Sequence, residues 1–378
     1  MTPAPRRVTQ RDIARLAGVS QATVSLVLNN RADSEVRIAP ETRERVLRTI
    51  QETGYVADPV ARRLVSRFNR IIGVFTYEPA FPSASRDFFH PFLFGIEEYA
   101  ERVGCDLLLF TSAPVVDGRR RIFHQDNRLR LADGCILLGQ ELDVDELTRL
   151  NTDGYPFVAV GRRDDAGGPV PYVGADYADA VRQLVQRAQR YGHRRMAYLR
   201  MEMTAESAAD RRLGFTEEIG AAESGAELVT DGRSADELLD RVLADGATVA
   251  FVEDFAVVVE LDRAARRRGL AVPGDLSILA LGDPTVPVPS DVAFTGFLIP
   301  REEMGRQAVE VLVSMVNGSA ESDGAGGAAG AGTGTYGEES GEETSAEDGG
   351  ETVRQRLLPC ELVEGSTLGA PDRTVHRS

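Results

Sequence analysis

A short helix predicted after Ser20 turns one set of side chains away from its apolar side: Gln21, Ala22, Ser25 and Leu26. A glutamine amide can pair with two atoms of adenine, whereas an alanine can contact a thymine methyl. In a helix-turn-helix, the N-terminal part of the second helix meets base edges in the major groove. These residues therefore indicate DNA contact, provided that the preceding residues supply the first helix and the turn.

The residues before this helix have the pattern of a helix followed by a tight turn. Thr9 can cap the first helix, and Asp12 three residues later completes a capping box. Gly18 permits the turn, and Ser20 caps the second helix. The expected apolar faces are Ile13, Leu16 and Ala17 on the first helix, and Val24, Val27 and Leu28 on the second. The segment predicts a helix-turn-helix; the alternative is an ordinary helical hairpin on an enzyme.

The charge of the chain is distributed unevenly. Residues 1–70 carry 13 arginines and 7 acidic residues, a net charge of +6, whereas the whole chain carries −16, which leaves −22 for the remainder. All the basic residues are arginine, since the chain contains no lysine. A basic N-terminal module on an acidic body indicates nucleic-acid contact at one end of the molecule. This distribution favours DNA binding over the enzyme hairpin.

Length and composition limit the class of protein. A chain of 378 residues with 42% hydrophobic residues is expected to form two or three domains. No apolar stretch approaches the ~20 residues of a membrane span, and the N-terminus lacks the apolar region of a signal peptide. The cysteines are far apart, at Cys105, Cys135 and Cys360, which suits a reducing compartment. We therefore expect a cytoplasmic protein without membrane contact.

A third helix and a connecting segment follow the first two helices. Pro40 suits a first helical position and Gly54 a helix end, although Ala39 is a weak N-cap. The inner face of this helix would be Val46, Leu47 and Ile50. Asp58 and Pro59 then begin a short helix over residues 59–67, whose apolar residues are Val60, Ala61, Leu64 and Val65. It is either a linker or a segment that folds only against a partner copy and DNA.

The rest of the chain alternates short apolar runs with amphipathic helices. The runs are RIIGVFT, CDLLLFT, GCILLG, PFVAVG, RMAYLR, TVAFVE and LSILAL, and the helical stretches include PFLFGIEEYAERVG and ADAVRQLVQRAQRYG. Such alternation predicts βαβ units and parallel sheets. Roughly 250 residues of this pattern are too many for one sheet, so we expect two α/β lobes. A ligand cleft would then lie at the carboxyl ends of the strands.

Several segments together resemble bacterial transcription regulators of the LacI/GalR (lactose-repressor) family: VTQRDIARLAGVSQATVSLVLN, APETRERVLRTIQETGY, VARRL, IIGVF, VPYVGAD, YGHRRMAYL, RRLGF, GLAVPGDLSIL and LVEGST. The resemblance covers nearly all of the chain except a glycine-rich insertion. It implies an all-α helix-turn-helix head on a two-lobed α/β core like that of periplasmic binding proteins. It also implies strands that cross between the lobes, homodimerisation through the body, and a structural role for His193 at a helix-to-strand corner.

The resemblance assigns DNA contacts to the head and to the short helix after it. Gln21 and Ala22 open the recognition helix, while Leu26 stands where some relatives place a polar base-reading side chain. Leu64 matches the leucine that wedges into the minor groove at the operator centre and kinks the duplex. The full expected set is Thr9, Ser20, Gln21, Ala22, Thr23, Ser25, Leu26, Asn29, Ala61 and Leu64.

The resemblance also implies an effector site in the cleft. Arg211, in RRLGF, matches the arginine that holds the ligand, and Asp254 matches the aspartate of an Asn-Asp pair whose Asn is replaced by Glu253. Gly161 and Gly282 stand where sugar-binding relatives have aspartates, so fewer carboxylates remain for sugar hydroxyls. Phe88, Phe89 and Phe92 either line the cleft or belong to the core. The expected set is Phe89, Phe92, Gly161, Arg211, Asp254 and Gly282.

Residues 318–351 differ in composition from the rest of the chain. They hold eleven glycines, nine acidic residues and no basic residue, and they precede a last strand within VRQRLLPCELVEG. Such a segment is predicted to be disordered; it is either a tolerated loop expansion or an acidic tether. The expected organisation is a DNA-binding head at 1–57, a hinge helix or linker at 58–69, a core at 70–317 and 352–370, the insertion at 318–351, and a tail at 371–378.

The sequence therefore predicts a homodimeric regulator, a repressor by preference, that binds a pseudo-palindromic operator. A small molecule in the cleft, a sugar or another metabolite, would lower operator affinity, and operator would reciprocally weaken the ligand. No Walker loop, G-x-S-x-G or H-E-x-x-H motif is present, so we expect no enzyme activity, cofactor or metal. Two alternatives stay open: a ligand-binding protein with a degenerate head, and a regulator without effector that is controlled by protein contact.

Overall fold

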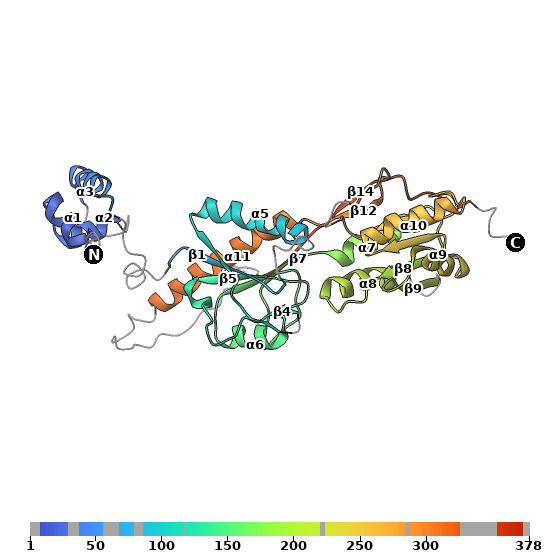
Figure 1. Cartoon of the computed structure of the whole chain (residues 1–378), viewed down its shortest axis with the longest axis horizontal. Coiled ribbons are helices and arrows are strands. Elements are labelled where there is room, and N and C mark those ends of the chain that lie inside the picture. Colours follow the sequence, from blue (N-terminus) through green and yellow to red (C-terminus); the bar gives the residue numbers. More distant parts are fainter. Residues whose placement is uncertain are drawn as a thin grey trace, which may run out of the picture. The chain divides into compact units, whose positions relative to one another are not determined.

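The computed structural model describes residues 8–28, 38–55, 68–78, 86–116, 118–219, 224–284, 288–325 and 354–372. The chain divides into two compact units, a head of residues Met1–Asn69 and a body of residues Arg70–Ser378 (Figure 1). Asn29, Ala61 and Leu64, and with them the expected hinge helix at 59–67, lie outside the described residues.

The head is built from three helices: α1 (Gln10–Ala17), α2 (Gln21–Leu28) and α3 (Pro40–Thr53). The capping box at the start of α1 is confirmed, since the Thr9 hydroxyl accepts from the Asp12 amide and the Asp12 carboxylate accepts from the Thr9 amide. Gly18 ends α1 with φ of 65°, a left-handed conformation that costs glycine little. Local chemistry therefore sets both ends of α1 where the sequence predicts them.

The core of the head differs from the predicted one at two leucines. Its buried residues are Ile13, Ala14, Ala17, Val24, Val27 and Val46. Leu16 is 58% exposed and Leu47 is 46% exposed, so the prediction that both face inward is wrong. Both α2 and α3 pack against α1, and the buried stripe of α1 follows positions i, i+1 and i+4 from Ile13, which turns position 16 to solvent. The buried stripe is therefore rotated around the helix relative to the one expected.

The body contains two six-stranded sheets, which define lobe 1 and lobe 2 (Figure 1). Lobe 1 has the order β13-β7-β6-β5-β1-β2, with all pairs parallel. Its strands are β1 (Ile71–Thr76), β2 (Asp106–Phe110), β5 (Gly134–Leu138), β6 (Phe157–Val160), β7 (Tyr172–Ala175) and β13 (Gln355–Leu358). A small hairpin of β3 (Val115–Val116) and β4 (Arg119–Arg120) and a 3₁₀ turn η1 (Leu129–Leu131) flank it.

Lobe 2 has the order β14-β12-β11-β10-β8-β9, in which only the pair β12–β14 is antiparallel among the described strands. Its strands are β8 (Arg195–Arg200), β9 (Ser224–Val229), β10 (Val249–Val252), β11 (Ser277–Ala280), β12 (Thr295–Leu298) and β14 (Glu361–Val363). All seven apolar runs noted in the sequence form strands, four of them in lobe 1 and three in lobe 2. Strands inside the sheets, such as β5, β10 and β11, are fully buried, which matches the continuous apolar composition of parallel strands, whereas the edge strand β2 is partly exposed.

The helices of the body are α5 (Arg86–Val103), α6 (Val144–Thr152), α7 (Tyr177–Arg190), α8 (Glu206–Ile219), α9 (Ala235–Ala244), α10 (Phe255–Arg267) and α11 (Arg301–Ala325). Two of the closest helix contacts depend on glycine. A Cβ at Gly95 of α5 would lie 1.9 Å from the Glu302 carbonyl oxygen, and one at Gly305 of α11 would lie 2.2 Å from that of Phe92. In lobe 2, a Cβ at Gly214 of α8 would lie 2.2 Å from the Ala178 oxygen of α7. These glycines bring helix backbones into contact.

The described residues pass between the lobes three times: from β7 into α7, from β12 into α11, and from β13 into β14. The last crossing corrects the sequence prediction, which placed one strand in VRQRLLPCELVEG. The structure has two strands in different sheets, separated by Pro359 and Cys360. Proline has no amide proton for a ladder, so the strand ends there and the chain changes sheet.

The start of the predicted disordered insertion is also corrected. Helix α11 continues to Ala325, so residues 318–325 are helical and the prediction is wrong for them. Extending an existing helix adds a hydrogen bond for each residue fixed, which offsets part of the ordering entropy that a free glycine-rich segment would lose. Residues 326–353 lie outside the described part of the chain.

His193 occupies the predicted corner between α7 and β8 and is fully buried. Its Nδ1 lies 2.8 Å from Thr248 Oγ1, and its Nε2 lies 2.8 Å from the Gly369 carbonyl oxygen. Because a carbonyl only accepts, Nε2 carries the proton of the neutral ring. Burial lowers the pKa of His193 below its usual value, against a smaller opposing effect of the Gly369 hydrogen bond. The ring ties the C-terminal segment to lobe 2.

Candidate DNA-contacting face and interlobe cavity

Helix α2 is the second helix of the motif, whose first residues are expected to meet base edges. Gln21 and Ala22 are exposed at its first turn, while Ser25 and Leu26 are half-buried. The Ser20 hydroxyl accepts from the Thr23 amide at 3.1 Å and lies 2.9 Å from the Thr23 hydroxyl. α2 therefore begins with a side-chain cap, and its first turn contains no acidic residue that would repel a phosphate.

Three of the expected DNA-contacting residues already have structural partners. The Thr9 hydroxyl donates to the Asp12 carboxylate at 2.7 Å, and Ser20 and Thr23 bond to each other. Caps of this kind fix the direction of a helix N-terminus and leave its remaining amides available to an anion. Gln21 and Ala22 are the members of the set whose side chains are exposed and have no described hydrogen bond.

A cavity of about 410 Å³ lies between the two lobes of the body. Many of its lining residues come from loops that directly follow strands: Gln140 after β5, Gly161 after β6, Met201 after β8, Glu253 and Asp254 after β10, and Gly282 and Asp283 after β11. The carboxyl ends of parallel strands meet at one edge of each sheet, and the two edges face this cavity. The cavity is therefore where an open α/β sheet is expected to hold a ligand.

Five of the six residues expected at an effector site line this cavity: Phe92, Gly161, Arg211, Asp254 and Gly282. Phe89 does not, and it is 2% exposed with its ring edge-on to that of Phe88 at 5.0 Å. Phe88 and Phe92 are four residues apart and share one face of α5, whereas Phe89 is rotated by about 100° into the core. The expectation that Phe89 lines the cleft is therefore wrong, and Phe88 does so instead.

Arg211 projects into the cavity in a defined orientation. Its guanidinium carbon lies 3.9 Å from the centre of the Tyr177 ring, which favours a cation over the ring face. Nε donates to the Leu281 carbonyl at 2.9 Å and Nη1 to that of Ser207 at 3.0 Å. Within the described residues no ion pair joins Arg211 to a carboxylate. The side chain thus brings a cation and spare donors to the cavity.

Gly282 lies beside this guanidinium in a backbone conformation that favours glycine. Its φ is +144°, and a Cβ there would lie 3.3 Å from Ile299 Cδ1 and 3.7 Å from Arg211 Nη2. An aspartate at position 282 would therefore strain the backbone and lie close against Ile299. The backbone conformation accounts for this glycine, which departs from the sugar-binding pattern.

Most carboxylates around the cavity already have partners. Glu253 accepts from the Tyr198 hydroxyl at 2.6 Å and from the Met201 amide at 2.8 Å. Burial and the adjacent Glu253 raise the pKa of Tyr198, which keeps this phenol a donor. Asp283 accepts from the Ile299 amide at 2.9 Å and from Arg301. Asp254 caps α10 with one oxygen, bonded to the Ala256 amide at 2.8 Å, and its second oxygen has no hydrogen bond within the described structure.

Arg163 is a buried cation at the edge of the cavity, and no sequence motif marks it. Its side chain is 4% exposed, and burial lowers its pKa. It donates at 2.8 Å to the carbonyls of Arg162 and Gly139, and at 3.1 Å to the Glu206 carboxylate. Gly161, with φ of +98°, lets this guanidinium lie close, since a Cβ would be 3.2 Å from Nη1. Only the fold reveals why position 161 is glycine.

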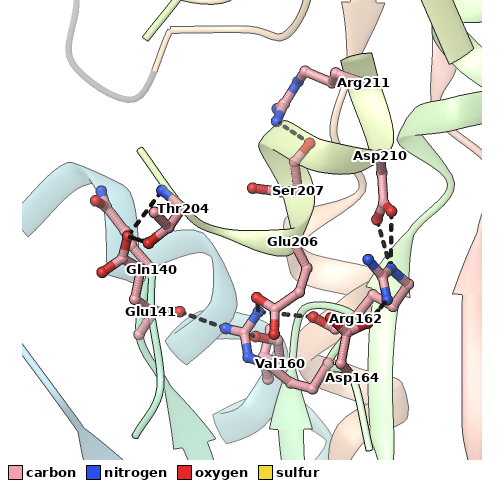
Figure 2. A network of polar contacts seen from close by, with 12 residues as sticks. Gln140, Glu141, Val160, Arg162, Asp164, Thr204, Glu206, Ser207, Asp210 and Arg211 are labelled. Atoms are coloured by element: carbon pink, nitrogen blue, oxygen red, sulfur yellow. Dashed lines mark hydrogen bonds and ion pairs between the residues drawn. The ribbon is translucent and has the colours of Figure 1, made fainter. Parts of the chain in front are cut away.

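A set of polar contacts joins the lobes beside the cavity, and we call it the interlobe latch (Figure 2). It comprises Glu141, Arg162 and Arg163 of lobe 1 and Thr204, Glu206 and Asp210 of lobe 2. Arg162 Nε contacts both Asp210 oxygens, at 2.9 and 2.8 Å. Glu141 accepts from the Thr204 amide at 3.1 Å and its hydroxyl at 2.6 Å, and these bonds, with Arg119, lower the pKa of Glu141.

No group of three or more His, Cys, Asp or Glu side chains among the described residues could hold a metal ion. In the same part of the chain, no helix is both long and apolar enough to cross a membrane.

Models of known protein families match both the head and the body of the chain. The family model described as "Bacterial regulatory proteins, lacI family" matches residues 9–58. "Periplasmic binding proteins and sugar binding domain of LacI family" matches residues 80–252, and "Periplasmic binding protein-like domain" matches residues 185–324. The matched ranges cover the head and both lobes.

Curated relatives align over most of their length. The HTH-type transcriptional regulator CelR of Thermobifida fusca is 31% identical over 330 residues, which cover 83% of this chain and 93% of that protein. Catabolite control protein A of Priestia megaterium is 26% identical over 322 residues, covering 82% of this chain and 93% of that protein. These relatives are named as regulators, not as enzymes.

Solved structures share the fold. The lac repressor dimer bound to operator and the anti-inducer ONPF aligns with a TM-score of 0.66 at 20% identity, covering 97% of this chain and all of that one. The CelR–cellobiose complex aligns with a TM-score of 0.55 at 23% identity, covering 96% of this chain and 100% of that one. With the relative identity above 30% and the family models on both units, the chain belongs to the LacI family of bacterial transcriptional regulators.

Proposed function

We propose that the chain is a homodimeric repressor that binds a pseudo-palindromic operator and responds to a small molecule in the interlobe cavity. The observation that carries the proposal is the pairing of two features in one chain: a capped helix-turn-helix with Gln21 and Ala22 exposed, and a 410 Å³ cavity built from strand ends of two lobes. The lac repressor dimer, solved on operator, supports this arrangement as an analogy of fold.

In the DNA half of the proposal, Gln21 pairs with an adenine edge and Ala22 contacts a thymine methyl. Thr9, Ser20, Thr23 and Ser25 orient the helix or contact phosphates, and half-buried Leu26 contributes little base discrimination. Asn29, Ala61 and Leu64 retain the roles that the family resemblance implies. The net charge of +6 over residues 1–70 supplies the non-specific attraction to phosphates.

The test of the DNA half is selection of bound sequences from a random duplex pool, followed by titration of the selected site. We expect a palindrome, and we expect log affinity to fall with log salt by about 0.9 per phosphate neutralised. Gln21→Ala should relax one base position in each half-site by about 1–3 kcal/mol. Gln51→Ala, a matched change at an exposed position of α3, should leave the selected sequence unchanged. A pool without enrichment would contradict the proposal.

In the effector half, the ligand is a sugar or another small metabolite. Arg211 offers donors and the second oxygen of Asp254 offers an acceptor, whereas Glu253 and Asp283 are already bonded. The other walls are largely apolar or aromatic and include Phe88, Phe92, Met201, Met203, Phe255 and Met304. Aromatic faces of this kind suit the apolar face of a sugar ring. The solved cellobiose complex of CelR supports a sugar as the first class to test.

The test of the effector half is thermal shift with cellobiose, monosaccharides, nucleosides and metabolic acids, since a ligand at 100 times its Kd adds about 2.7 kcal/mol. Asp254→Asn keeps an α10 cap while removing the charge, so it should weaken a hydroxyl-bearing ligand without unfolding lobe 2. Arg211→Gln should abolish the shift, whereas Arg212→Gln, which loses the Glu227 pair outside the cavity, should not. If no compound in the panel shifts the melting temperature, the result would favour control by protein contact.

A further inference from the structure

We propose that the interlobe latch is a positioning device, in which Arg162, Arg163 and Glu141 hold α8, and with it Arg211, over the cavity before any ligand binds. The inference takes the cavity to be the effector site, as proposed above. It adds that the chain's own side chains hold the lobes closed over this site.

The sequence of α8 divides the helix between the latch and the cavity. Glu206 and Asp210 are four residues apart, so both project from one stripe of the helix, and both bond to lobe 1. Ser207 and Arg211 follow one position later on the adjacent stripe and line the cavity. Figure 2 shows Asp210 directed to Arg162 while Arg211 lies above Ser207 on the same helix. Any movement of α8 away from lobe 1 therefore moves Arg211 as well.

Arg163 makes the closed arrangement dependent on charge. Three acceptors of its guanidinium are carbonyls of its own lobe, those of Gly139, Val160 and Arg162, and the carboxylate bonded to it is Glu206 of lobe 2. A buried cation requires a counter-charge, and Glu206 contributes more of it than the more distant Glu78 of lobe 1. Separation of the lobes would break the Arg163–Glu206 ion pair, and would at the same time leave Asp210 without its two-oxygen contact to Arg162.

The two ends of the latch are held firmly within their own lobes. α8 packs on α7 through Gly214, where backbone meets backbone at Ala178. Glu141 is also paired with Arg119, and Arg162 with Asp164, both within lobe 1. The contacts between lobes therefore join groups that are also bonded within their own lobes, so a relative movement of the lobes would break them together.

The test is hydrogen–deuterium exchange of the full-length, ligand-free protein, with the Thr204 amide as reporter. This amide bonds to Glu141 across the lobes and is untouched by substitutions elsewhere in the latch. In the double variant Glu206→Gln/Asp210→Asn we expect exchange at Thr204 to accelerate at least fivefold. The matched control Glu217→Gln/Asp240→Asn makes the same charge change at ion pairs confined to lobe 2 and should leave Thr204 unchanged.

A double-mutant cycle separates positioning from general damage. If Arg162 and Asp210 act through their contact, Arg162→Gln, Asp210→Asn and the pair together should accelerate Thr204 exchange to a similar extent. Thermal melts show whether each variant is folded. If the double variant Glu206→Gln/Asp210→Asn does not fold, the single Asp210→Asn variant replaces it in the exchange experiment. An unprotected Thr204 amide in the unsubstituted chain, additive effects in the cycle, or unchanged exchange would overturn the proposal. Neither DNA nor ligand enters the experiment, so it can fail independently of the proposed function.

Discussion

The head and the interlobe cavity place their candidate recognition residues in opposite ways. In the head, the described candidates lie between residues 9 and 26 on two helices, with α2 presenting the base-reading positions. In the cavity, Phe92, Arg211 and Gly282 come from three distant parts of the chain. Placing the base-reading residues of the head requires only a capped helix with the correct side facing outward. Placing the residues of the cavity requires two sheets, the chain crossings between them and the latch. Damage to the head should therefore be local, and damage to the body should spread.

The largest expected effect separates the two regions completely. A chain that starts at Arg70 should lose all specific binding to the selected operator, because α2 is gone, while the body retains its own cooperative melt. Fluorescence anisotropy with labelled operator and calorimetry of the same sample measure both quantities. If the shortened chain still bound the operator specifically, the head would not be the recognition element.

A smaller but still large effect is expected where helix backbones meet in lobe 1. Gly305→Ala adds a Cβ 2.2 Å from the Phe92 carbonyl, so α5 must move, and the cost should reach about 1–3 kcal/mol. Phe88 and Phe92 lie on α5, so ligand response should fall too. Urea melts and thermal shift measure this.

Gly318→Ala is the matched control for this prediction. It lies on the same helix with nothing within 4 Å of the added Cβ. Alanine is favoured over glycine in helices by about 1 kcal/mol, so this change should be neutral or stabilising. Equal losses from both substitutions would contradict the packing argument.

The capping box of α1 should contribute less, and only within the head. Thr9→Ala removes the two bonds of the Thr9 hydroxyl to Asp12, leaves that of the Thr9 amide, and should cost the head about 1 kcal/mol. Exchange protection should fall in α1, while the amides of lobe 2 stay as they are. Thr53→Ala, whose hydroxyl bonds back to Thr49 inside α3, is the control and should have little effect. A loss of protection in the body would show that the units are not independent.

The smallest expected effect concerns pH and the body alone. Burial lowers the pKa of His193 in the folded state, so the unfolded chain binds more protons between that lowered value and the ordinary one, about 6.5. Stability from this group is therefore complete above about pH 6.5 and falls as the pH drops toward the folded pKa. Urea melts at pH 7.5 and 6.0 should show the decline, and His193→Gln should flatten it. A steeper slope in the variant would contradict this account.

Local patterns predicted much of the fold correctly. The capping box at Thr9, the left-handed Gly18 and Gly54, and the helix start at Pro40 follow from the chemistry of one turn of chain. The seven apolar runs form strands; six of them lie inside the sheets, where parallel strands are apolar along their whole length, and β2 lies at an edge. β9, β12 and β13 gave weaker signals, since polar or exposed positions interrupt them.

The errors share a physical cause. Residue spacing groups side chains such as Leu16 and Phe89 on one side of a helix, but it does not show which other helix or sheet that side packs against. The burial of Arg163 was not predicted, because nothing in the neighbouring sequence distinguishes it from the many exposed arginines. The lining of the cavity by Gly161 and Gly282 was expected, but the fold alone buries the Arg163 guanidinium against Gly161.

The sequence by itself determined the helix ends of the head, the α/β character of the body and the family, because these depend on caps, periodicity and motif order. Tertiary structure alone decided which phenylalanines face the cavity, that the chain crosses between lobes at Pro359 and Cys360, and that α8 carries latch and cavity residues on adjacent stripes. Those outcomes depend on contacts between segments tens to hundreds of residues apart, whose energies no local pattern encodes.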